Sequence, residues 1–245
     1  MPRTVLVTGA SSGLGRALAL ELARRGAHLA LAARRKDELE RVAADARALG
    51  AEAHVHVVDV GDAAAAMETV RRAEKDLGSL DMVIANAGVT LFHHPSTMAW
   101  DDVARVFDVN VKGAVATLMA AVPIMIAQQG GHLVGVSSLA SRRGLPMSAA
   151  YCASKAALST FLESLRLDLA RANVRVTDVQ PGFVETPMLE GATHPTPLAW
   201  TSEKAARVIA TRLLSRRPPA VVAFPWPIDL LTSLRQMVVS VSRHR

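Results

Sequence analysis

Cysteine and long apolar runs are both scarce in this chain of 245 residues. Cys152 is the only cysteine, which excludes an internal disulfide and is typical of proteins from a reducing compartment. No uninterrupted apolar stretch approaches the roughly 20 residues of a membrane-spanning helix. The N-terminus enters a strand-like run directly, without the apolar core of a signal peptide. We therefore expect a soluble, cytoplasmic protein.

Acidic and aromatic residues are also in the minority. The chain has 28 Lys and Arg against 22 Asp and Glu, which gives a formal net charge of +6. Such a balance suits nucleic acid, a membrane surface or an anionic ligand. The arginines are spread over many predicted helices, however, and no aromatic-rich basic module accompanies them. We interpret the excess as a solvated basic surface and expect no nucleic-acid partner.

A metal-ligand pattern is missing as well. His54 and His56 alternate along a predicted strand, but no cysteine, aspartate or third histidine stands at a matching spacing. His93 and His94 belong to a predicted surface loop near the mouth of the site discussed below. We therefore interpret all four as structural or surface histidines and expect no metal site.

The alternation of short apolar runs with longer amphipathic ones predicts the fold. Half of the residues are hydrophobic, so the chain can bury one full core, and we expect a single domain over residues 1–245. The predicted strands are residues 4–8, 28–33, 54–59, 82–85, 132–137, 175–180 and 220–224. The predicted helices are residues 14–25, 36–49, 63–77, 100–129, 148–171 and 202–215. This order is typical of an α/β fold, a doubly wound parallel sheet of about seven strands with helices on both faces.

Tyr151 and Lys155 form a pattern that depends on helical spacing. They are four residues apart in a predicted helix without internal glycine or proline, so their side chains share one face, one turn apart. A free phenol has a pKa near ~10. A fixed cation nearby favours the phenolate and brings that pKa closer to the working range of a proton donor or acceptor. Taken alone, the pair is better explained as two solvated side chains on a surface helix.

A glycine-rich turn, TGASSGLG at residues 8–15, follows the first predicted strand and opens the first predicted helix. Glycines permit a tight turn and a close approach of the backbone to a pyrophosphate, whose charge the helix N-terminus favours. The spacing is Gly-x3-Gly-x-Gly and not the G-x-G-x-x-G of the commonest dinucleotide fold. Its position between strand and helix favours cofactor binding over an ordinary turn.

The end of the second predicted strand bears on which dinucleotide binds. An NAD-selective site places an acidic residue there, to accept hydrogen bonds from the adenosine ribose. Ala33 occupies that position in this chain, and Arg34, Arg35 and Lys36 follow. A guanidinium suits bidentate binding of a 2′-phosphate. We interpret Arg35 and Lys36 as a solvated helix start, while Arg34 favours NADP(H); NAD(H) stays an alternative.

Other strand ends carry small or polar residues that suit a ligand lying across the sheet. Asp59 and Val60 end the third predicted strand and are placed to reach an adenine ring. Asn86, Ala87 and Gly88 end the fourth, where open α/β sheets bind their ligands.

Together these pieces resemble the short-chain dehydrogenase/reductase family over nearly the whole chain. The matching motifs are TGASSGLG at residues 8–15, DV at 59–60, NAG at 86–88, Asn110, Ser137-Ser138, Tyr151-x3-Lys155 and Pro181-Gly182. Their spacing agrees too, with 28 residues from Asn110 to Ser138, 13 more to Tyr151 and four more to Lys155. Each motif is weak alone, but the ordered set is specific. The resemblance implies a Rossmann-like fold and an oxidoreductase.

The resemblance also implies roles for the matching residues. Tyr151 would be the general acid for carbonyl reduction and the general base for alcohol oxidation. Lys155 would lower the pKa of Tyr151 and hold the nicotinamide ribose. Ser138 would hydrogen-bond the substrate oxygen, with Ser137 as the second choice, and Asn110 would link Lys155 through water to a proton relay.

The family's cofactor contacts map onto many positions of this chain. They are Gly9, Ser11, Ser12, Gly13, Leu14, Arg34, Asp59, Val60, Asn86, Ala87, Gly88, Tyr151, Lys155, Pro181, Gly182, Val184 and Thr186. Ser12 stands where some NADP-preferring relatives carry a basic residue, so the assignment of NADP(H) depends on Arg34.

The predicted substrate contacts are mostly apolar, which favours a hydrophobic ketone or alcohol. They are Ser138, Leu139, Leu145, Phe183 and Met188, and the same stretches contain Met147 and Leu189. Cys152 neighbours Tyr151, but its side chain points about a hundred degrees away around the helix, so we expect it to pack and not to react.

Two C-terminal segments complete the predictions. Residues 190–215 form a predicted substrate-loop or lid region, rich in Pro, Thr and Gly at its start. Residues 225–245 form an amphipathic tail with apolar residues at helical spacing and basic ones near its end. Three roles fit that tail: packing in the core or between subunits, cover for the pocket, or contact with an anionic membrane.

The sequence thus predicts an NADP-preferring carbonyl reductase or alcohol dehydrogenase with a small-molecule substrate. Members of the family are commonly homodimers or homotetramers, so we expect a homo-oligomer. A protein of the same fold that binds NADP(H) as a sensor or scaffold without catalysis is the alternative. An intact catalytic set argues against that alternative, because a pure binder does not need the phenol and ammonium pair.

Overall fold

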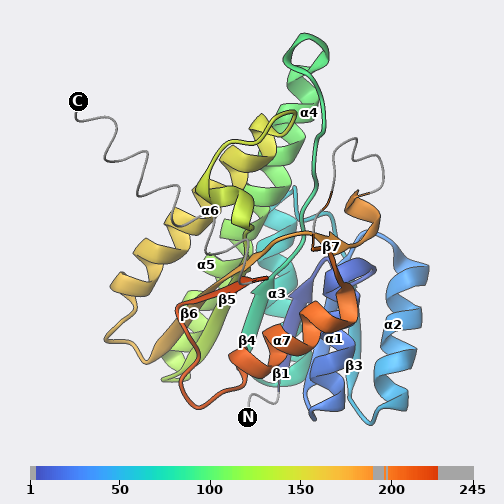
Figure 1. The fold of residues 1–245 in the computed structure, drawn as a ribbon. Helices are drawn as coiled ribbons and strands as arrows, with labels where there is room; N and C mark the ends of the chain where they lie inside the picture. The colour runs from blue at the N-terminus through green and yellow to red at the C-terminus, as the bar shows by residue number, and fades with distance from the viewer. Residues whose placement is uncertain (1–3, 190–195, 197, 226–245) are drawn as a thin grey trace.

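Seven strands, all parallel, form the main sheet of the computed structural model, which describes residues 4–189, 196 and 198–225 (Figure 1). The strands are β1 (Thr4–Thr8), β2 (His28–Ala33), β3 (Ala53–Val57), β4 (Met82–Ala85), β5 (Gly131–Val136), β6 (Val174–Pro181) and β9 (Val221–Phe224). Their order across the sheet is β3-β2-β1-β4-β5-β6-β9. The predicted doubly wound α/β fold is confirmed.

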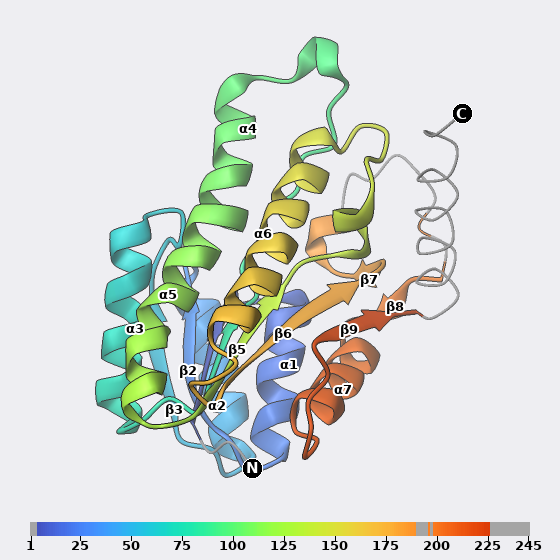
Figure 2. The ribbon, with the colours of Figure 1, turned by 90° about the vertical axis from the view of Figure 1, so that its left-hand side faces the viewer.

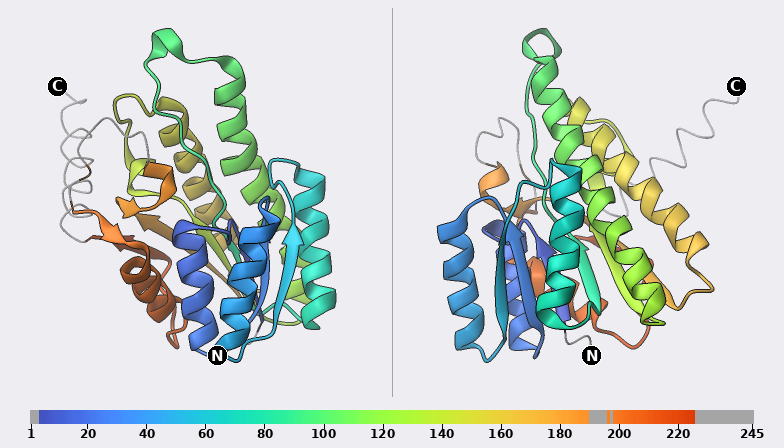
Figure 3. Two further views of the ribbon diagram at one scale, coloured as in Figure 1. Left: turned by 90° about the vertical axis from the view of Figure 1, so that its right-hand side faces the viewer. Right: turned by 180° about the vertical axis from the view of Figure 1, so that it is seen from behind.

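Helices cover both faces of this sheet (Figures 2 and 3). One layer consists of α1 (Gly13–Arg24), α2 (Lys36–Ala48) and α7 (Ser202–Leu213). The other consists of α3 (Ala63–Leu77), α4 (Trp100–Phe107), α5 (Ala114–Ala127) and α6 (Ala149–Asp168). The two layers enclose two separate apolar clusters, one on each side of the sheet.

Burial on both faces explains why the strand sequences read as continuous apolar runs. Val5, Leu6 and Val7 of β1 are all fully buried, and they alternate between the two apolar clusters. Burial of each such side chain contributes about 1.5–3 kcal/mol to the stability of the fold. A shift of one residue in strand pairing would move these side chains to the opposite face, so their burial fixes the register of the sheet.

The helix predicted for residues 100–129 is interrupted, which corrects that prediction. Between α4 and α5 the chain forms a π-helical turn, η2 (Asp108–Gly113), and α5 ends at Ala127. A π turn holds one more residue than an α turn and therefore changes which side chains face the sheet. Asn110 lies within this turn.

The stretch Trp100–Ala127 is long and apolar enough to cross a membrane, and it is the one such stretch among the described residues. We expected no such stretch because we considered only uninterrupted apolar runs, and this stretch is interrupted by Lys112. In the structure 56% of its most apolar window is buried. The stretch packs against α3, α6 and strands β4 and β5, as a core helix does.

The C-terminal segments are described in part. A small second sheet pairs β7 (Val184–Glu185) with β8 (Trp200–Thr201). Much of the predicted lid at residues 190–215 is α7, which packs against α1 and buries Ala205 and Ile209 in the core. Residues 190–195 and 197 of that lid, and residues 226–245 of the predicted tail, lie outside the described residues.

The sheet order reverses between β1 and β4, and this creates the position for a site. The helix that follows β1 packs on one face of the sheet, and the helices that follow β4 pack on the other face. A crevice therefore opens between the carboxyl ends of these two strands. The loops after β1, β4, β5 and β6 all meet at this edge.

His132 makes the stability of this sheet depend on pH. It is buried on β5, its Nε2 lies 2.9 Å from Thr177 Oγ1, and burial lowers its pKa to about 3. The unfolded chain, with a pKa near 6.5, therefore binds a proton more strongly than the folded chain does. This contribution to stability is complete above pH 6.5 and is lost as the pH falls toward 3.

We expect chemical denaturation to show a loss of about 2 kcal/mol from this group between pH 7 and pH 5. His132→Gln removes the titrating ring and should flatten that part of the pH profile. Thr177→Val removes the hydrogen bond but keeps the ring, so it should lower stability and leave the slope unchanged. Equal slopes for His132→Gln and the parent would contradict the assignment.

Candidate active site

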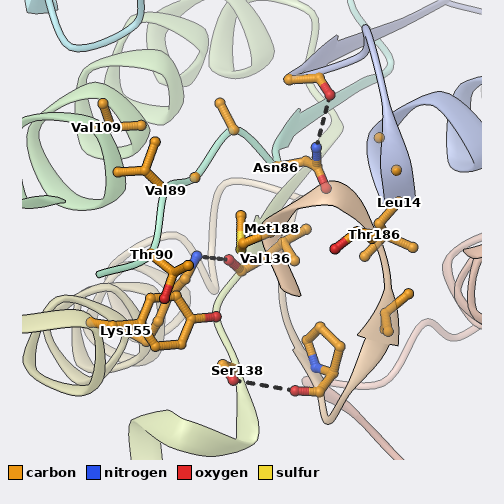
Figure 4. A pocket seen from close by; sticks show the side chains of 18 of the residues that line it. Leu14, Asn86, Val89, Thr90, Val109, Val136, Ser138, Lys155, Thr186 and Met188 are labelled. Atoms are coloured by element: carbon orange, nitrogen blue, oxygen red, sulfur yellow. Dashed lines mark hydrogen bonds between the residues drawn. The ribbon is translucent and has the colours of Figure 1, made fainter. Parts of the chain in front are cut away.

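A cavity of about 1020 Å³ opens at the carboxyl edge of the sheet. Every residue predicted to contact cofactor or substrate lines it: Gly9, Ser11, Ser12, Gly13, Leu14, Arg34, Asp59, Val60, Asn86, Ala87, Gly88, Ser138, Leu139, Leu145, Tyr151, Lys155, Pro181, Gly182, Phe183, Val184, Thr186 and Met188. Of the predicted catalytic residues, Asn110 alone does not line it. Figure 4 shows that side chains from both ends of the chain converge here, among them Leu14, Lys155 and Thr186.

The glycine-rich turn is pressed against the strands beside it. Gly9 has a φ of +68°, and a Cβ there would lie 2.8 Å from the Cα of Ala87. A Cβ on Gly15 would lie 2.3 Å from the carbonyl oxygen of Gly9, so α1 begins directly on the turn. The turn is tied to β4, because Asn86 Nδ2 donates to the Thr8 carbonyl at 2.9 Å.

The N-terminus of α1 faces the cavity. Its N-cap residue, Ser12, is extended and offers no side-chain hydrogen bond to the first turn, while Gly13 and Leu14 line the cavity. Backbone N–H groups at an uncapped helix start are suited to an anion. These features fit the pyrophosphate of a dinucleotide.

The second predicted strand ends in a basic group at one end of the cavity. Arg34 and Arg35 are both exposed and line the cavity after Ala33. Arg35 Nη2 donates to Ser11 Oγ at 3.1 Å, which links the two loops at this end. The sequence analysis treated Arg35 as solvated, so its contact with the glycine-rich turn is a correction.

Asp59 is held by an arginine that the sequence analysis did not identify. Arg105 Nη2 of α4 lies 2.8 Å from Asp59 Oδ2, and Arg105 also lines the cavity. Burial by itself would raise the pKa of the Asp59 carboxyl, but hydrogen bonds from Arg105 and from the Gly61 amide lower it below its ordinary value. No local pattern predicts this pair, because Arg105 and Asp59 are 46 positions apart in the sequence.

Lys155 is a buried cation on the face of α6 that packs against the sheet. It is 3% exposed, and its Nζ donates to the Val136 carbonyl at 2.8 Å (Figure 4). The Nζ lies 5.7 Å from the centre of the Tyr151 ring. Burial lowers the pKa of Lys155 to about 8, against an opposing effect of Asp178. The predicted phenol and ammonium pair is therefore brought together inside the protein and not on a solvated surface.

The pKa of Tyr151 moves in the direction opposite to the prediction. Tyr151 lines the cavity and keeps some exposure, but the surrounding protein desolvates its hydroxyl and raises the pKa. A hydrogen bond from Ser138 lowers it by less, and Cys152 raises it slightly. Loss of solvent disfavours the phenolate more than nearby groups favour it, so the phenol keeps its proton.

The two serines that follow β5 have different surroundings. Ser138 Oγ donates to the Pro181 carbonyl at 3.3 Å, the dashed line at Ser138 in Figure 4, and accepts from the Ala140 amide. Its side chain also interacts with the Tyr151 hydroxyl. Ser137 is buried and donates to the Asp178 carboxylate. Of the two serines it is Ser138 that interacts with the Tyr151 hydroxyl, so Ser138 is the better placed to reach a substrate oxygen together with Tyr151.

Asn110 lies behind the cavity and holds its wall. Its side chain is fully buried; Oδ1 accepts from the Val89 amide at 2.8 Å, and Nδ2 donates to the Val89 carbonyl and to Ser154 Oγ. Asn110 Oδ1 and Lys155 Nζ each lie 3.3 Å from the position of an ideal Cβ on Gly88. The two groups are therefore neighbours, while the predicted link through water stays a prediction.

The substrate end of the cavity is largely apolar. Leu139, Leu145, Phe183 and Met188 are joined there by Phe92 and Leu189, whereas Met147 does not line it. Two polar groups were missed. Arg143 is exposed on the loop after Ser138, and Thr90 has a buried Oγ1 without a hydrogen-bond partner.

Among the described residues, no group of three or more His, Cys, Asp and Glu side chains is arranged so that it could hold a metal ion. His54 and His56 form side-chain contacts with Glu52 and Asp76, respectively, and neither histidine lines the cavity.

Comparisons with known proteins agree with this geometry. The short chain dehydrogenase family matches residues 3–196. An uncharacterised oxidoreductase from Myxococcus xanthus is 44% identical over 236 residues, which cover 96% of this chain and 92% of the relative. A short chain dehydrogenase/reductase from Burkholderia phymatum, solved in complex with NAD, superposes with a TM-score of 0.89 at 26% identity over 98% of this chain and 95% of its own. An alcohol dehydrogenase from Thermococcus sibiricus, complexed with 5-hydroxy-NADP, gives a TM-score of 0.82 at 27% identity over 91% and 94%.

The contacts of Asn110 lead to a test of stability. Asn110→Ala leaves the Val89 amide and carbonyl without their partner and removes one donor to Ser154 Oγ, so we expect a loss of roughly 2–3 kcal/mol in the free energy of unfolding. Asp108→Ala, in the same π turn, removes only an exposed pair with Lys112 and should cost less than about 1 kcal/mol. Urea unfolding of both variants measures the difference, and equal midpoints would show that Asn110 does not hold this wall.

Proposed function

The chain belongs to the short-chain dehydrogenase family, and from that premise we propose that it transfers hydride between NADP(H) and a ketone or secondary alcohol. The observation that carries the proposal is the convergence of Ser138, Tyr151 and Lys155 on one cavity with a glycine-rich turn. A binding protein without catalysis would need the turn alone.

The residues of the cavity fit a dinucleotide along its length. The uncapped start of α1 suits the pyrophosphate, Asp59 and Val60 lie toward the adenine end, and Lys155 and Thr186 lie toward the nicotinamide end. When bound there, the nicotinamide cofactor supplies or accepts the hydride. All other parts of the reaction fall to side chains of the chain.

In the direction of reduction, Tyr151 would give its proton to the substrate oxygen. Its raised pKa keeps the hydroxyl protonated at neutral pH, as a general acid requires. Tyr151 is also the only tyrosine in the chain. As the proton leaves, the nearby Lys155 ammonium stabilises the phenolate that forms, and Ser138 donates a hydrogen bond to the same substrate oxygen. The reverse sequence oxidises an alcohol, with the phenolate as base.

The substrate itself is proposed to be hydrophobic. The cavity wall near Ser138 is made mostly of Leu, Phe and Met side chains, which gain by contact with an apolar ketone or alcohol. A fluorescence screen of NADPH and NADH against lipid-like, steroid-like and sugar-like carbonyls tests this class directly.

A homo-oligomer and a cytoplasmic location stay part of the proposal. Trp100, Met119, Ile126 and Leu167 expose large apolar side chains on α4, α5 and α6, the kind of surface that subunit contacts cover. Light scattering behind size-exclusion chromatography measures the assembly. The compartment is inferred from the single cysteine.

Tyr151→Phe is the test of the catalytic mechanism. It removes the transferable proton with little change in shape, so turnover with an accepted carbonyl should fall by about 100-fold or more while NADPH binding is kept. Cys152→Ala, the matched control in the next position of α6, should retain the parent's activity. Parent-like turnover in Tyr151→Phe would refute the mechanism. Tight NADPH binding by the parent without turnover over a broad panel would favour the sensor or scaffold.

Arg34→Ala tests the preference for NADP(H). Loss of a guanidinium that pairs with the 2′-phosphate should weaken NADPH binding by roughly 10-fold or more and leave NADH binding unchanged. Arg35→Ala should have a smaller effect because Arg35 is engaged with Ser11. Lys36→Ala, which does not line the cavity, is the control. Equal losses for both cofactors in Arg34→Ala would overturn the assignment.

A further inference from the structure

A carboxylate is buried directly behind the active site. Asp178 of β6 is 2% exposed and accepts three hydrogen bonds, from Ser137 Oγ, from Ser159 Oγ at 2.6 Å and from Gln180 Nε2 at 2.6 Å. In the part of the chain that the structure describes, Asp178 forms no ion pair. Both of its oxygens act only as acceptors in these three hydrogen bonds, which is the pattern of a carboxylate and not of a carboxylic acid.

The fold connects this carboxylate to Lys155 by two routes. Asp178 pairs in register with Gly135 of β5, and the next residue, Val136, accepts the hydrogen bond of Lys155. On α6, Ser159 follows Lys155 by one turn and points to the same side, where it donates to Asp178. Asp178 is therefore held to both elements that position the Lys155 ammonium, strand β5 and helix α6.

The network also reaches the loop that carries Ser138. Ser137, which precedes Ser138, is fixed by Asp178, and Gln180 is held from the other side by Arg142 through Nε at 2.9 Å and Nη2 at 2.7 Å. Both ends of the segment from Ser137 to Arg142 are thus tied to β6.

The other charged and titratable groups around Lys155 leave Asp178 as its main electrostatic partner. On α6 itself Tyr151 is a neutral phenol, while Glu163 and Arg166 lie two and three turns away. From η2, Asp108 and Lys112 pair with each other at 2.8 Å. From the far ends of β5 and β6 come His132, whose pKa of about 3 keeps it neutral, and the exposed Arg175. Arg142 from η3 (Leu139–Arg142) contacts Gln180. Asp178 is the one charged group that raises the pKa of Lys155 against burial.

We propose that Asp178 is a positioning residue for the reaction, whose charge keeps Lys155 protonated and whose hydrogen bonds hold Ser137 and the segment of Ser138 in place. This rests on the proposed function, because it assigns Asp178 a role through Lys155. Asp178 itself contacts neither cofactor nor substrate, since it does not line the cavity.

The test compares Asp178→Asn with Ser159→Ala. The first removes the charge with little change in volume, and the second removes one hydrogen bond to Asp178 but keeps the charge. The titration of the Lys155 13Cε resonance, assigned by its absence in Lys155→Met, reports on the ammonium directly. We expect its midpoint near pH 8 in the parent and lower by roughly half to one pH unit in Asp178→Asn, with little change in Ser159→Ala. The alkaline limb of kcat/KM should move by the same amount.

The outcomes separate this proposal from the proposed function. A Lys155 midpoint in Asp178→Asn that coincides with the parent's, in a variant that unfolds cooperatively, overturns the role of the charge. A shifted midpoint in a protein without turnover supports it and refutes the proposed function instead. If Asp178→Asn does not fold, Asp178→Ser is the second variant. It removes the same charge and leaves space for a water molecule that accepts hydrogen bonds from the hydroxyls of Ser137 and Ser159. The midpoint of the Lys155 titration is measured in the same way.

Discussion

The buried ammonium of Lys155 is the constraint on which the site depends. A charge in the interior is tolerated only with hydrogen bonds and a compensating field, and here these come from the Val136 carbonyl and from Asp178. Both lie on neighbouring central strands, so the ammonium is fixed by the most rigid part of the fold. Tyr151 precedes Lys155 by one turn of α6, so the placement of Lys155 also determines where Tyr151 lies. The site is therefore buried in the fold because the Lys155 ammonium is stabilised only there, next to the Val136 carbonyl and Asp178.

The cofactor half depends on a different constraint, which is close approach of the backbone. Gly9 and Gly15 bring α1, the first turn and Ala87 within distances that no side chain would permit, and Asn86 fixes the turn by a hydrogen bond to Thr8. The crevice between β1 and β4 is therefore narrow at its base, and the uncapped helix start faces it. This is the part of the cavity where we propose that the pyrophosphate of the cofactor binds.

The sequence predicted the strands and most cavity residues well, because apolar runs and turn motifs are local signals. It missed features that depend on distant partners or on burial. Arg105 pairs with Asp59, which is 46 positions away in the sequence. No local residue pattern predicts the π turn that contains Asn110. Asp178 was read only as part of a strand, since Ser137 and Ser159 become its partners through the fold. The pKa of Tyr151 was predicted in the wrong direction because desolvation cannot be read from a spacing of four residues.

The two kinds of residue in the site differ in what their replacement costs the fold. Asn110, Lys155 and Asp178 are buried and hydrogen-bonded, so a change there leaves polar groups unsatisfied and lowers stability. Arg34 and Arg143 are exposed, and their replacement leaves the core untouched. A substitution at either arginine is therefore expected to change the surface of the cavity without lowering stability, whereas one at Asn110, Lys155 or Asp178 changes both the site and the stability of the fold.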